Sequence, residues 1–119
     1  PIVLAMKSNG ALRICSDFKV SINPHIITDI HPLPTFDEII SKVGGGKLFS
    51  VIDLKDAYLQ LEVEEESRQY LVIATHKGFY RYKRLPFGVC FAPNLFQKIM
   101  DTILSGLDNV ACYLDDIIV

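Results

Sequence analysis

The chain has 119 residues, of which 50% are hydrophobic, and this length and composition suit one folded domain and argue against a multidomain or disordered protein. Twelve basic and fourteen acidic residues give a formal net charge of −2, which is weak evidence against a nucleic-acid partner. No apolar run approaches the roughly 18 residues of a membrane span, so no membrane partner is expected.

The first predicted element is a β-hairpin. Ile2–Met6 is a short apolar run, Ser8-Asn9-Gly10 is a turn signal, and residues 11–18 alternate as a returning strand does. The sequence therefore predicts two paired strands at the start of the chain.

A connector and a short helix are predicted next. Residues 21–34 contain three prolines and no sustained periodicity, which indicates an extended connector. Thr35 and Glu38 have the spacing of a capping box, which predicts a helix over residues 36–43. Gly44 stands where a glycine commonly ends a helix.

Short strands are predicted in the middle of the chain. Residues 48–53 form an apolar run that predicts a buried strand ending on the carboxylate of Asp53. Residues 61–63, 70–74 and 79–85 predict a meander of further strands.

The last of these segments mixes basic and aromatic residues. Such a mixture can bind a nucleic-acid strand by charge and stacking, and an edge strand protected by charges explains it equally well. Both interpretations stay open for Lys77, Arg81, Lys83 and Arg84, which alternate with Phe79, Tyr80 and Tyr82.

The C-terminal third predicts a helix followed by a hairpin. From Pro93 onward, apolar residues recur at three- and four-residue spacing until Gly106, the pattern of an amphipathic helix. Residues 110–114 and 117–119 are apolar strands separated only by Asp115-Asp116, which predicts a tight hairpin with two carboxylates at its tip.

These two adjacent carboxylates have two interpretations. Asp is an ordinary turn residue, so a solvated turn is the simpler one. If Asp53 lay beside Asp115 and Asp116, three carboxylates would form a site of the kind that binds Mg²⁺, and a pair of such ions supports phosphoryl transfer. Spacing along the sequence leaves both interpretations open.

The three cysteines, Cys15, Cys90 and Cys112, lie far apart and form no C-x-x-C pair. This pattern fits neither a disulfide framework nor a zinc site and favours a reducing compartment. The chain begins at Pro1 and ends within an apolar run at Val119, so we expect it to be a piece of a longer protein.

Six blocks of residues occur along the chain in an order that is specific in combination. They are Arg13 with Asp17-Phe18 and Asn23; His31 to Pro34; Gly44-Gly45 with Lys47 and Phe49-Ser50; Asp53-Leu54 with Ala57-Tyr58; Leu85-Pro86-Phe87-Gly88 with Ala92-Pro93 and Phe96-Gln97; and Tyr113-Leu114-Asp115-Asp116. With these blocks the chain resembles the fingers and palm of a reverse transcriptase, in particular those of gypsy-type LTR retrotransposons.

The resemblance implies an α+β fold in which an antiparallel palm sheet is backed by helices, with part of the fingers. Residues 1–46 would form a fingers portion and connector, and residues 47–119 a palm portion with an interleaved fingers segment. The thumb, RNase H and integrase of a Pol polyprotein would lie outside this chain. The implied location is intracellular, in cytoplasmic particles with a nuclear phase.

The resemblance also implies RNA-directed DNA polymerase activity, in which a primer 3′-hydroxyl attacks the α-phosphate of a dNTP on an RNA or DNA template. Asp53, Asp115 and Asp116 would be the catalytic and metal-binding residues. Together with the backbone of Leu54 they would hold two Mg²⁺ or Mn²⁺ ions.

Further roles follow from the same positions. Tyr58 would pack beneath the sugar and exclude a ribose 2′-hydroxyl. The implied dNTP-binding residues are Arg13, Lys7, Lys55, Asp56, Ala57, Tyr58 and Phe87. The implied template and primer contacts are Gly88, Pro93, Gln97, Tyr113 and Leu114.

Two other hypotheses are weighed against this one. A catalytically silent relic, or a domesticated domain that only binds nucleic acid or protein, is disfavoured because Asp53, Asp115 and Asp116 are all present. Another palm-type polymerase, such as a group II intron protein, is disfavoured by the L-P-F-G and Y-L-D-D blocks together.

Overall fold

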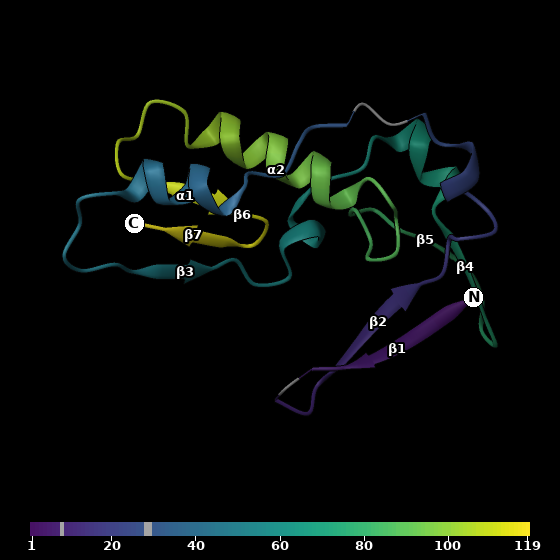
Figure 1. Ribbon diagram of the computed structural model, residues 1–119. Helices are drawn as coiled ribbons and strands as arrows, with labels where there is room; N and C mark the ends of the chain where they lie inside the picture. The colour runs from purple at the N-terminus through teal and green to yellow at the C-terminus, as the bar shows by residue number, and fades with distance from the viewer. Residues whose placement is uncertain (8, 28–29) are drawn as a thin grey trace. The chain divides into compact units, whose positions relative to one another are not determined.

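The computed structural model describes residues 1–7, 9–27 and 30–119, so part of the predicted turn at Ser8 and of the predicted connector at Thr28 and Asp29 lies outside the described residues. Antiparallel strands and helices alternate along the chain (Figure 1), which confirms an α+β fold. None of the described helices is long and apolar enough to cross a membrane.

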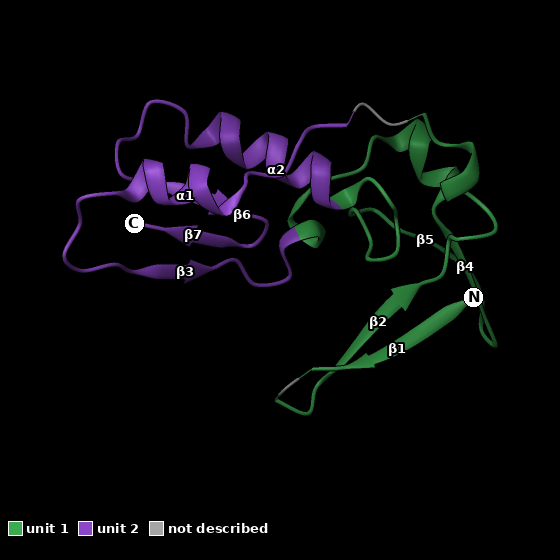
Figure 2. Cartoon of the chain, viewed as in Figure 1, with its two compact units in different colours: residues 1–28, 58–92 green, residues 29–57, 93–119 purple. Residues whose placement is uncertain are grey.

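The chain forms two compact units (Figure 2). Unit 1 consists of Pro1–Thr28 and Tyr58–Ala92, and unit 2 consists of Asp29–Ala57 and Pro93–Val119. Each unit therefore combines segments that are distant in sequence. The division into a fingers portion over residues 1–46 and a palm portion with an interleaved fingers segment over residues 47–119 stays a prediction.

Unit 1 contains two hairpins. Strands β1 (Ile2–Met6) and β2 (Leu12–Ser16) pair antiparallel with Ile2 opposite Ser16, which confirms the predicted N-terminal hairpin. Strands β4 (Val72–Thr75) and β5 (Gly78–Arg81) form the second hairpin.

The predicted meander is shorter than expected. Residues 61–63 form no strand and make a single antiparallel bridge between Glu62 and Arg84. The next residues wind into a 3-10 helix over Glu65–Tyr70, so the strand predicted from Tyr70 begins only at Val72. Acidic and polar residues dominate this helix and leave little apolar surface to hold an extended strand.

The core of unit 1 is small and apolar. Its buried side chains are Phe18, Leu71, Leu85, Val89 and Ala92. Fully burying a side chain such as Phe or Leu stabilises a fold by about 1.5–3 kcal/mol. Because Phe18 follows β2, while Leu85 and Val89 flank the Leu85-Pro86-Phe87-Gly88 turn, this core joins the segment after β2 to the segment around that turn.

Unit 2 is built on a three-stranded antiparallel sheet in the order β3-β7-β6. The strands are β3 (Val51–Asp53), β6 (Ala111–Tyr113) and β7 (Asp116–Ile118), and helix α1 (Phe36–Val43) packs against β6. Strand β3 lies at the edge of the sheet. The strand predicted over residues 48–53 is therefore shorter and more exposed than expected, with Leu48 92% exposed.

The predicted capping box of α1 is confirmed. The Thr35 hydroxyl accepts a hydrogen bond from the Glu38 backbone N–H at 3.3 Å, and the Glu38 carboxylate accepts one from the Thr35 backbone N–H at 2.7 Å. These bonds lower the pKa of Glu38. Gly44 is the C-cap residue, as its position in the sequence indicated, in an extended conformation, and the next residue, Gly45, has a positive φ of 96°.

Helix α2 (Ala92–Ile103) confirms the predicted amphipathic helix. Phe96, Gln97 and Met100 are buried. Ile103 has the spacing of the apolar face but is 64% exposed and lies outside the core. The buried face of α2 therefore includes one amide side chain among apolar ones.

Gly88 offers a test of the packing in unit 1. It has a φ of +105°, and a Cβ there would lie 1.7 Å from the Ser16 carbonyl oxygen. We expect Gly88→Ala to lower the free energy of unfolding by more than about 3 kcal/mol in urea denaturation. The new Cβ would meet backbone atoms of Ser16, which cannot move aside as the end of a flexible side chain can. Gly10→Ala is the control, since Gly10 has a φ of +81° and open space, and should cost about 1–2 kcal/mol. Equal losses would contradict the close approach.

Candidate active site

Two of the predicted catalytic carboxylates lie directly opposite each other in unit 2. Asp53 at the end of β3 pairs with Asp116 at the start of β7. Ser50 and Val119 exchange both backbone hydrogen bonds at 2.9 Å. Because bonded and non-bonded pairs alternate along an antiparallel ladder, Asp53 and Asp116 form a non-hydrogen-bonded pair, with Cα atoms about 4.5 Å apart and side chains on the same face.

The third carboxylate belongs to the adjoining turn. The Leu54 backbone N–H donates to the Asp115 carbonyl oxygen at 2.8 Å, which continues the ladder past Asp53. Asp53, Asp115 and Asp116 are all exposed, and none of them forms an ion pair with a described residue. Like charges in directly opposite positions destabilise a strand pair unless a cation compensates them.

The turn itself differs from the sequence prediction by one residue. Tyr113 pairs with Asp116, so the turn consists of Leu114 and Asp115, and Asp116 belongs to the strand. Leu114 has a φ of +54°, whereas Asp115 is not among the residues with positive φ. Positive φ at the first turn residue alone is typical of a type II′ hairpin turn and is strained for leucine.

The oxygen atoms of these carboxylates are the donors that Mg²⁺ and Mn²⁺ prefer. Among the described residues, however, no group of three or more His, Cys, Asp or Glu side chains is arranged to hold a metal ion. The donor set therefore fits a divalent cation in its chemistry, and the two-ion site stays a prediction.

The negative charge of the turn reaches a neighbouring thiol. Burial, followed by the carboxylates of Asp101, Asp115 and Asp116, raises the pKa of Cys112 to about 11. The pKa of this thiol on β6 is therefore raised mainly by burial, and the nearby carboxylates add to the effect.

The segment after β3 contains three of the implied dNTP-binding residues, Lys55, Asp56 and Ala57. Lys55 and Asp56 form a turn, and Asp56 has a φ of +53°. Ala57 is buried and begins a 3-10 helix, Ala57–Gln60. A left-handed residue within such a turn is a feature of backbone N–H nests, which bind anions.

In unit 1 three predicted nucleotide-binding side chains form a stack. The guanidinium carbon of Arg13 lies 4.4 Å from the centroid of the Phe87 ring. The Tyr58 and Phe87 centroids are 5.1 Å apart with the rings tilted by 48°. Each cation–π or tilted aromatic contact of this kind stabilises the folded state by about 0.5–1.5 kcal/mol.

Arg13 keeps part of its hydrogen-bonding capacity unused. Its Nε is buried and has no hydrogen-bond partner among the described residues. Lys7, the other cation predicted for this hairpin, begins the turn after β1, where its backbone N–H donates to the Ala11 carbonyl oxygen at 2.7 Å. The phosphate contact of Lys7 stays a prediction.

The turn that carries Phe87 and Gly88 is fixed by hydrogen bonds to its backbone. The Ser16 backbone N–H donates to the Phe87 carbonyl oxygen at 3.2 Å, and the Asn23 side-chain amide donates to the Gly88 carbonyl oxygen at 3.0 Å. Asn23 also accepts a hydrogen bond from the Cys90 backbone N–H at 3.1 Å. Asn23 was recognised only as a motif residue, and its supporting role emerges from these contacts.

The residues predicted to contact template and primer differ in accessibility. Tyr113 is exposed, and Leu114 and Pro93 are partly exposed. Gln97 is 0% exposed, and its amide is bonded to residues of unit 2. The Gln97 side chain therefore bonds to β6 and the turn after it, and the predicted contact of Gln97 with template or primer stays a prediction.

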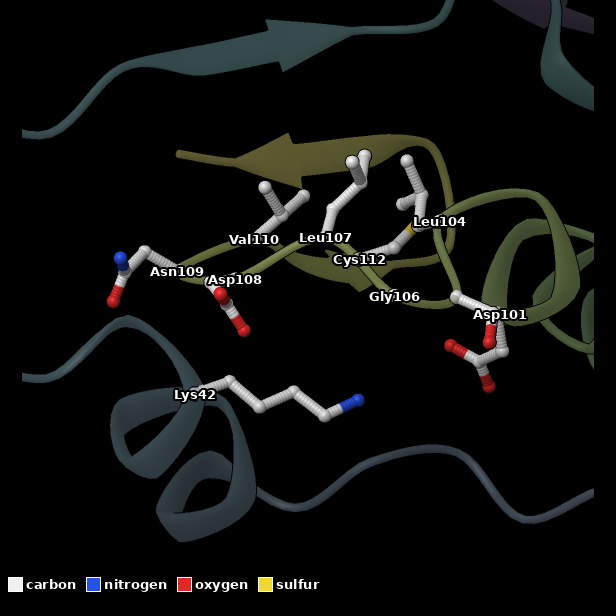
Figure 3. Close-up of a pocket in the computed structure, with 10 residues that line it drawn as sticks. Lys42, Asp101, Leu104, Gly106, Leu107, Asp108, Asn109, Val110 and Cys112 are labelled. Carbon is white, nitrogen blue, oxygen red and sulfur yellow. The ribbon is translucent and has the colours of Figure 1, made fainter.

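Unit 2 also has a cavity of about 440 Å³. Figure 3 shows Lys42 of α1 extending toward Asp101 of α2 across it. None of the predicted site residues lines it; the lining residues are Lys42, Asp101, Leu104, Ser105, Gly106, Leu107, Asp108, Asn109, Val110 and Cys112.

Comparisons with known proteins cover nearly the whole chain. The family model described as "Reverse transcriptase (RNA-dependent DNA polymerase)" matches residues 6–119. An uncharacterized protein of Caenorhabditis elegans is 49% identical over 119 residues, which are 99% of this chain and 9% of that protein. The retrovirus-related Pol polyprotein from transposon 412 of Drosophila melanogaster is 39% identical, with 90% and 9% covered.

A solved structure has the same fold. The foamy viral protease-reverse transcriptase in complex with RNA/DNA hybrid superposes with a TM-score of 0.84 at 21% identity, over 99% of this chain and 16% of that one. The chain thus spans about a tenth of the length of the curated relatives and a sixth of this structure.

The raised pKa of Cys112 predicts unequal thiol reactivity. At pH 8 a thiol with a pKa of about 11 is only about 0.1% thiolate, the reactive form. Because Cys90 is exposed and Cys112 is buried, iodoacetamide at pH 8 should alkylate Cys90 first, as followed by mass spectrometry. Comparable rates at the two cysteines in the folded protein would contradict the burial and charge described for Cys112.

Proposed function

The chain belongs to the reverse transcriptase (RNA-dependent DNA polymerase) family, and from this premise we propose that it is part of an enzyme that catalyses template-directed transfer of deoxynucleotides from dNTPs to a primer 3′-hydroxyl, and that it is inactive without the rest of that enzyme. The observation that carries the proposal is the close cross-strand pair of Asp53 and Asp116 beside Asp115. These neighbouring carboxylates repel one another, and bound divalent cations would compensate their charge.

The proposed role of these carboxylates is to hold two Mg²⁺ or Mn²⁺ ions, with the Leu54 backbone as a further ligand. Bound in pairs, such ions activate an attacking hydroxyl and stabilise the leaving oxygen in phosphoryl transfer. The protein contributes rigidity: the ladder from Ser50 to Leu54 fixes Asp53, and the turn fixes Asp115.

Two sets of residues are proposed to bind the dNTP. Arg13 offers guanidinium donors to a phosphate while its face packs on Phe87. The backbone amides of Lys55, Asp56 and Ala57 suit the triphosphate, since Asp56 has the positive φ of a nest. Lys7 is proposed as a further cation for the triphosphate.

Tyr58 is proposed to select the sugar. Its ring is supported by Phe87 at 5.1 Å, and a rigid aromatic surface at that point would obstruct a ribose 2′-hydroxyl. Selection by steric exclusion needs such support, because a mobile side chain would move aside.

The template and primer are proposed to contact Gly88, Pro93, Tyr113 and Leu114. A foamy viral relative in complex with RNA/DNA hybrid supports this class of partner. Because the chain covers only 9% of the transposon 412 polyprotein, we propose that it acts as part of a Pol polyprotein with thumb, RNase H and integrase. A location in cytoplasmic particles with a nuclear phase is part of the same proposal.

The metal-binding assignment predicts a large loss of activity on neutralising one carboxylate. Expressed within the reading frame that encodes it, the chain should incorporate dTTP on a poly(rA) template in a Mg²⁺- or Mn²⁺-dependent reaction. Asp115→Asn should lower the rate by at least about 100-fold, the scale of losing a group that stabilises transition-state charge.

The matched control is Asp108→Asn, which neutralises a carboxylate of the cavity wall in the same unit and should leave the rate within about twofold. Asp115→Asn activity equal to that of the control would refute the assignment. Absence of incorporation by the unaltered protein would favour a silent relic.

The proposed sugar selection predicts a change of substrate preference. Tyr58→Val should raise incorporation of ribonucleotides relative to deoxynucleotides by at least about tenfold, because the obstruction is removed while the carboxylates remain. Tyr80→Val, at an exposed tyrosine of β5, is the control. An unchanged ratio in competition assays would show that Tyr58 has only a packing role.

A further inference from the structure

Gln97 holds the turn that carries Asp115. Its side chain is 0% exposed, and its Nε2 donates to the Cys112 carbonyl oxygen at 2.9 Å while its Oε1 accepts from the Leu114 backbone N–H at 2.9 Å. One amide group on α2 therefore binds the last part of β6 and the first residue of the turn.

The orientation of this amide is fixed by a carboxylate. Gln97 Nε2 also donates to Asp101 Oδ1 at 3.0 Å, one helical turn along α2. An ionised carboxylate only accepts hydrogen bonds, so Nε2 has to face Asp101 and Oε1 has to face Leu114. With the amide reversed, two acceptors would meet at Asp101 and two donors would meet at Leu114.

The carboxylate is in turn held by a histidine from another part of unit 2. His31 Nε2 lies 2.7 Å from Asp101 Oδ2, which places the proton on Nε2. The His31 backbone is fixed too, because its carbonyl oxygen accepts from the Asn94 side-chain amide at 2.7 Å. His31 and Asp101 are about one third exposed, with side-chain fractions of 29% and 33%.

The network ends at a strained residue. Leu114 has a φ of +54°, a conformation that non-glycine residues rarely adopt unless their surroundings impose it. A hydrogen bond from the Cys112 thiol to the Leu114 carbonyl oxygen at 3.3 Å adds to this support. The strained turn, and with it the backbone of Asp115, is thus tied to a buried side chain.

We propose that Gln97, Asp101 and His31 are positioning residues that form a relay from the His31-Pro32-Leu33-Pro34 segment to the Leu114-Asp115 turn and hold the catalytic carboxylate in place. Its consequence for catalysis rests on the proposed function. Its structural part, which is control of the turn conformation, is independent of any activity.

A core glutamine that only fills space makes a different prediction. Leucine has a similar volume, so Gln97→Leu would leave the turn unchanged if packing were the whole role. If the relay holds the turn, Gln97→Leu frees the Leu114 N–H. Asp101→Asn has a smaller effect, because its amide removes the constraint on orientation and keeps an acceptor.

Amide hydrogen exchange in the metal-free protein tests the structural part. Gln97→Leu should speed exchange of the peptide covering residues 111–116 by about tenfold or more, and leave residues 72–81 of unit 1 unchanged. Exchange at residues 111–116 equal to that of the unaltered protein would overturn the proposal. If Gln97→Leu does not fold, the same exchange is measured in Asp101→Asn and His31→Phe. Faster exchange of residues 111–116 in these variants would support the proposal, and unchanged exchange would overturn it.

Kinetics test the catalytic part. Gln97→Leu should lower kcat for dTTP incorporation about 10- to 100-fold, as loss of a supporting partner typically does, with KM changed less than about threefold. His31→Phe should lower kcat, and His31→Gln should restore most of it, since a Gln amide can also donate to Asp101. The control is Asp108→Asn, which lies on the same cavity outside the relay.

The two proposals fail in different ways. If the unaltered protein incorporates no nucleotide, the proposed function fails, and exchange at residues 111–116 still decides the relay. If it is active and Gln97→Leu changes neither exchange nor kcat, the relay fails and the proposed function stands. Equal losses in His31→Phe and His31→Gln would exclude His31 from the relay.

Discussion

The antiparallel pairing of β3 with β7 is the constraint on which the rest of the site depends. It joins residues more than sixty positions apart in sequence and fixes them at both ends, through the paired bonds of Ser50 and Val119 and the bond from Leu54 to Asp115. Because side chains alternate between faces, a slip by one residue would move Asp116 away from Asp53. The register therefore brings the two carboxylates together against their mutual repulsion.

Residues with positive φ lie on both sides of this pair. Asp56 follows β3 and Leu114 precedes β7, with φ values of +53° and +54°. Asp adopts this region more readily than most non-glycine residues, whereas a leucine stays in it only where the surroundings impose it. At Leu114 the imposing group is Gln97, which α2 buries beneath the turn. In unit 1 a different device, the close approach of Gly88 to Ser16, fixes the turn that carries Phe87.

Local signals in the sequence predicted local structure well. The capping box at Thr35 and Glu38 and the hairpin of β1 and β2 are formed by neighbouring residues, and both are confirmed. The facing of Asp53 and Asp116, the turn position of Leu114 and the burial of Gln97 could not be predicted in this way. They depend on pairing and packing between distant segments, which spacing along the chain does not encode. The family was recognisable because its motif residues recur in order.

The most direct test of the account is to locate bound Mn²⁺ by paramagnetic broadening of amide resonances in the isotope-labelled protein. Substoichiometric Mn²⁺ should broaden the signals of Asp53, Leu54 and residues 114–116 first, and Asp53→Asn should abolish this effect. The acidic segment Glu64–Glu66 is an internal comparison, because it carries as many carboxylates as the site without a paired register. Broadening that begins at Glu64–Glu66, or that persists unchanged in Asp53→Asn, would contradict the carboxylate pair as the metal site.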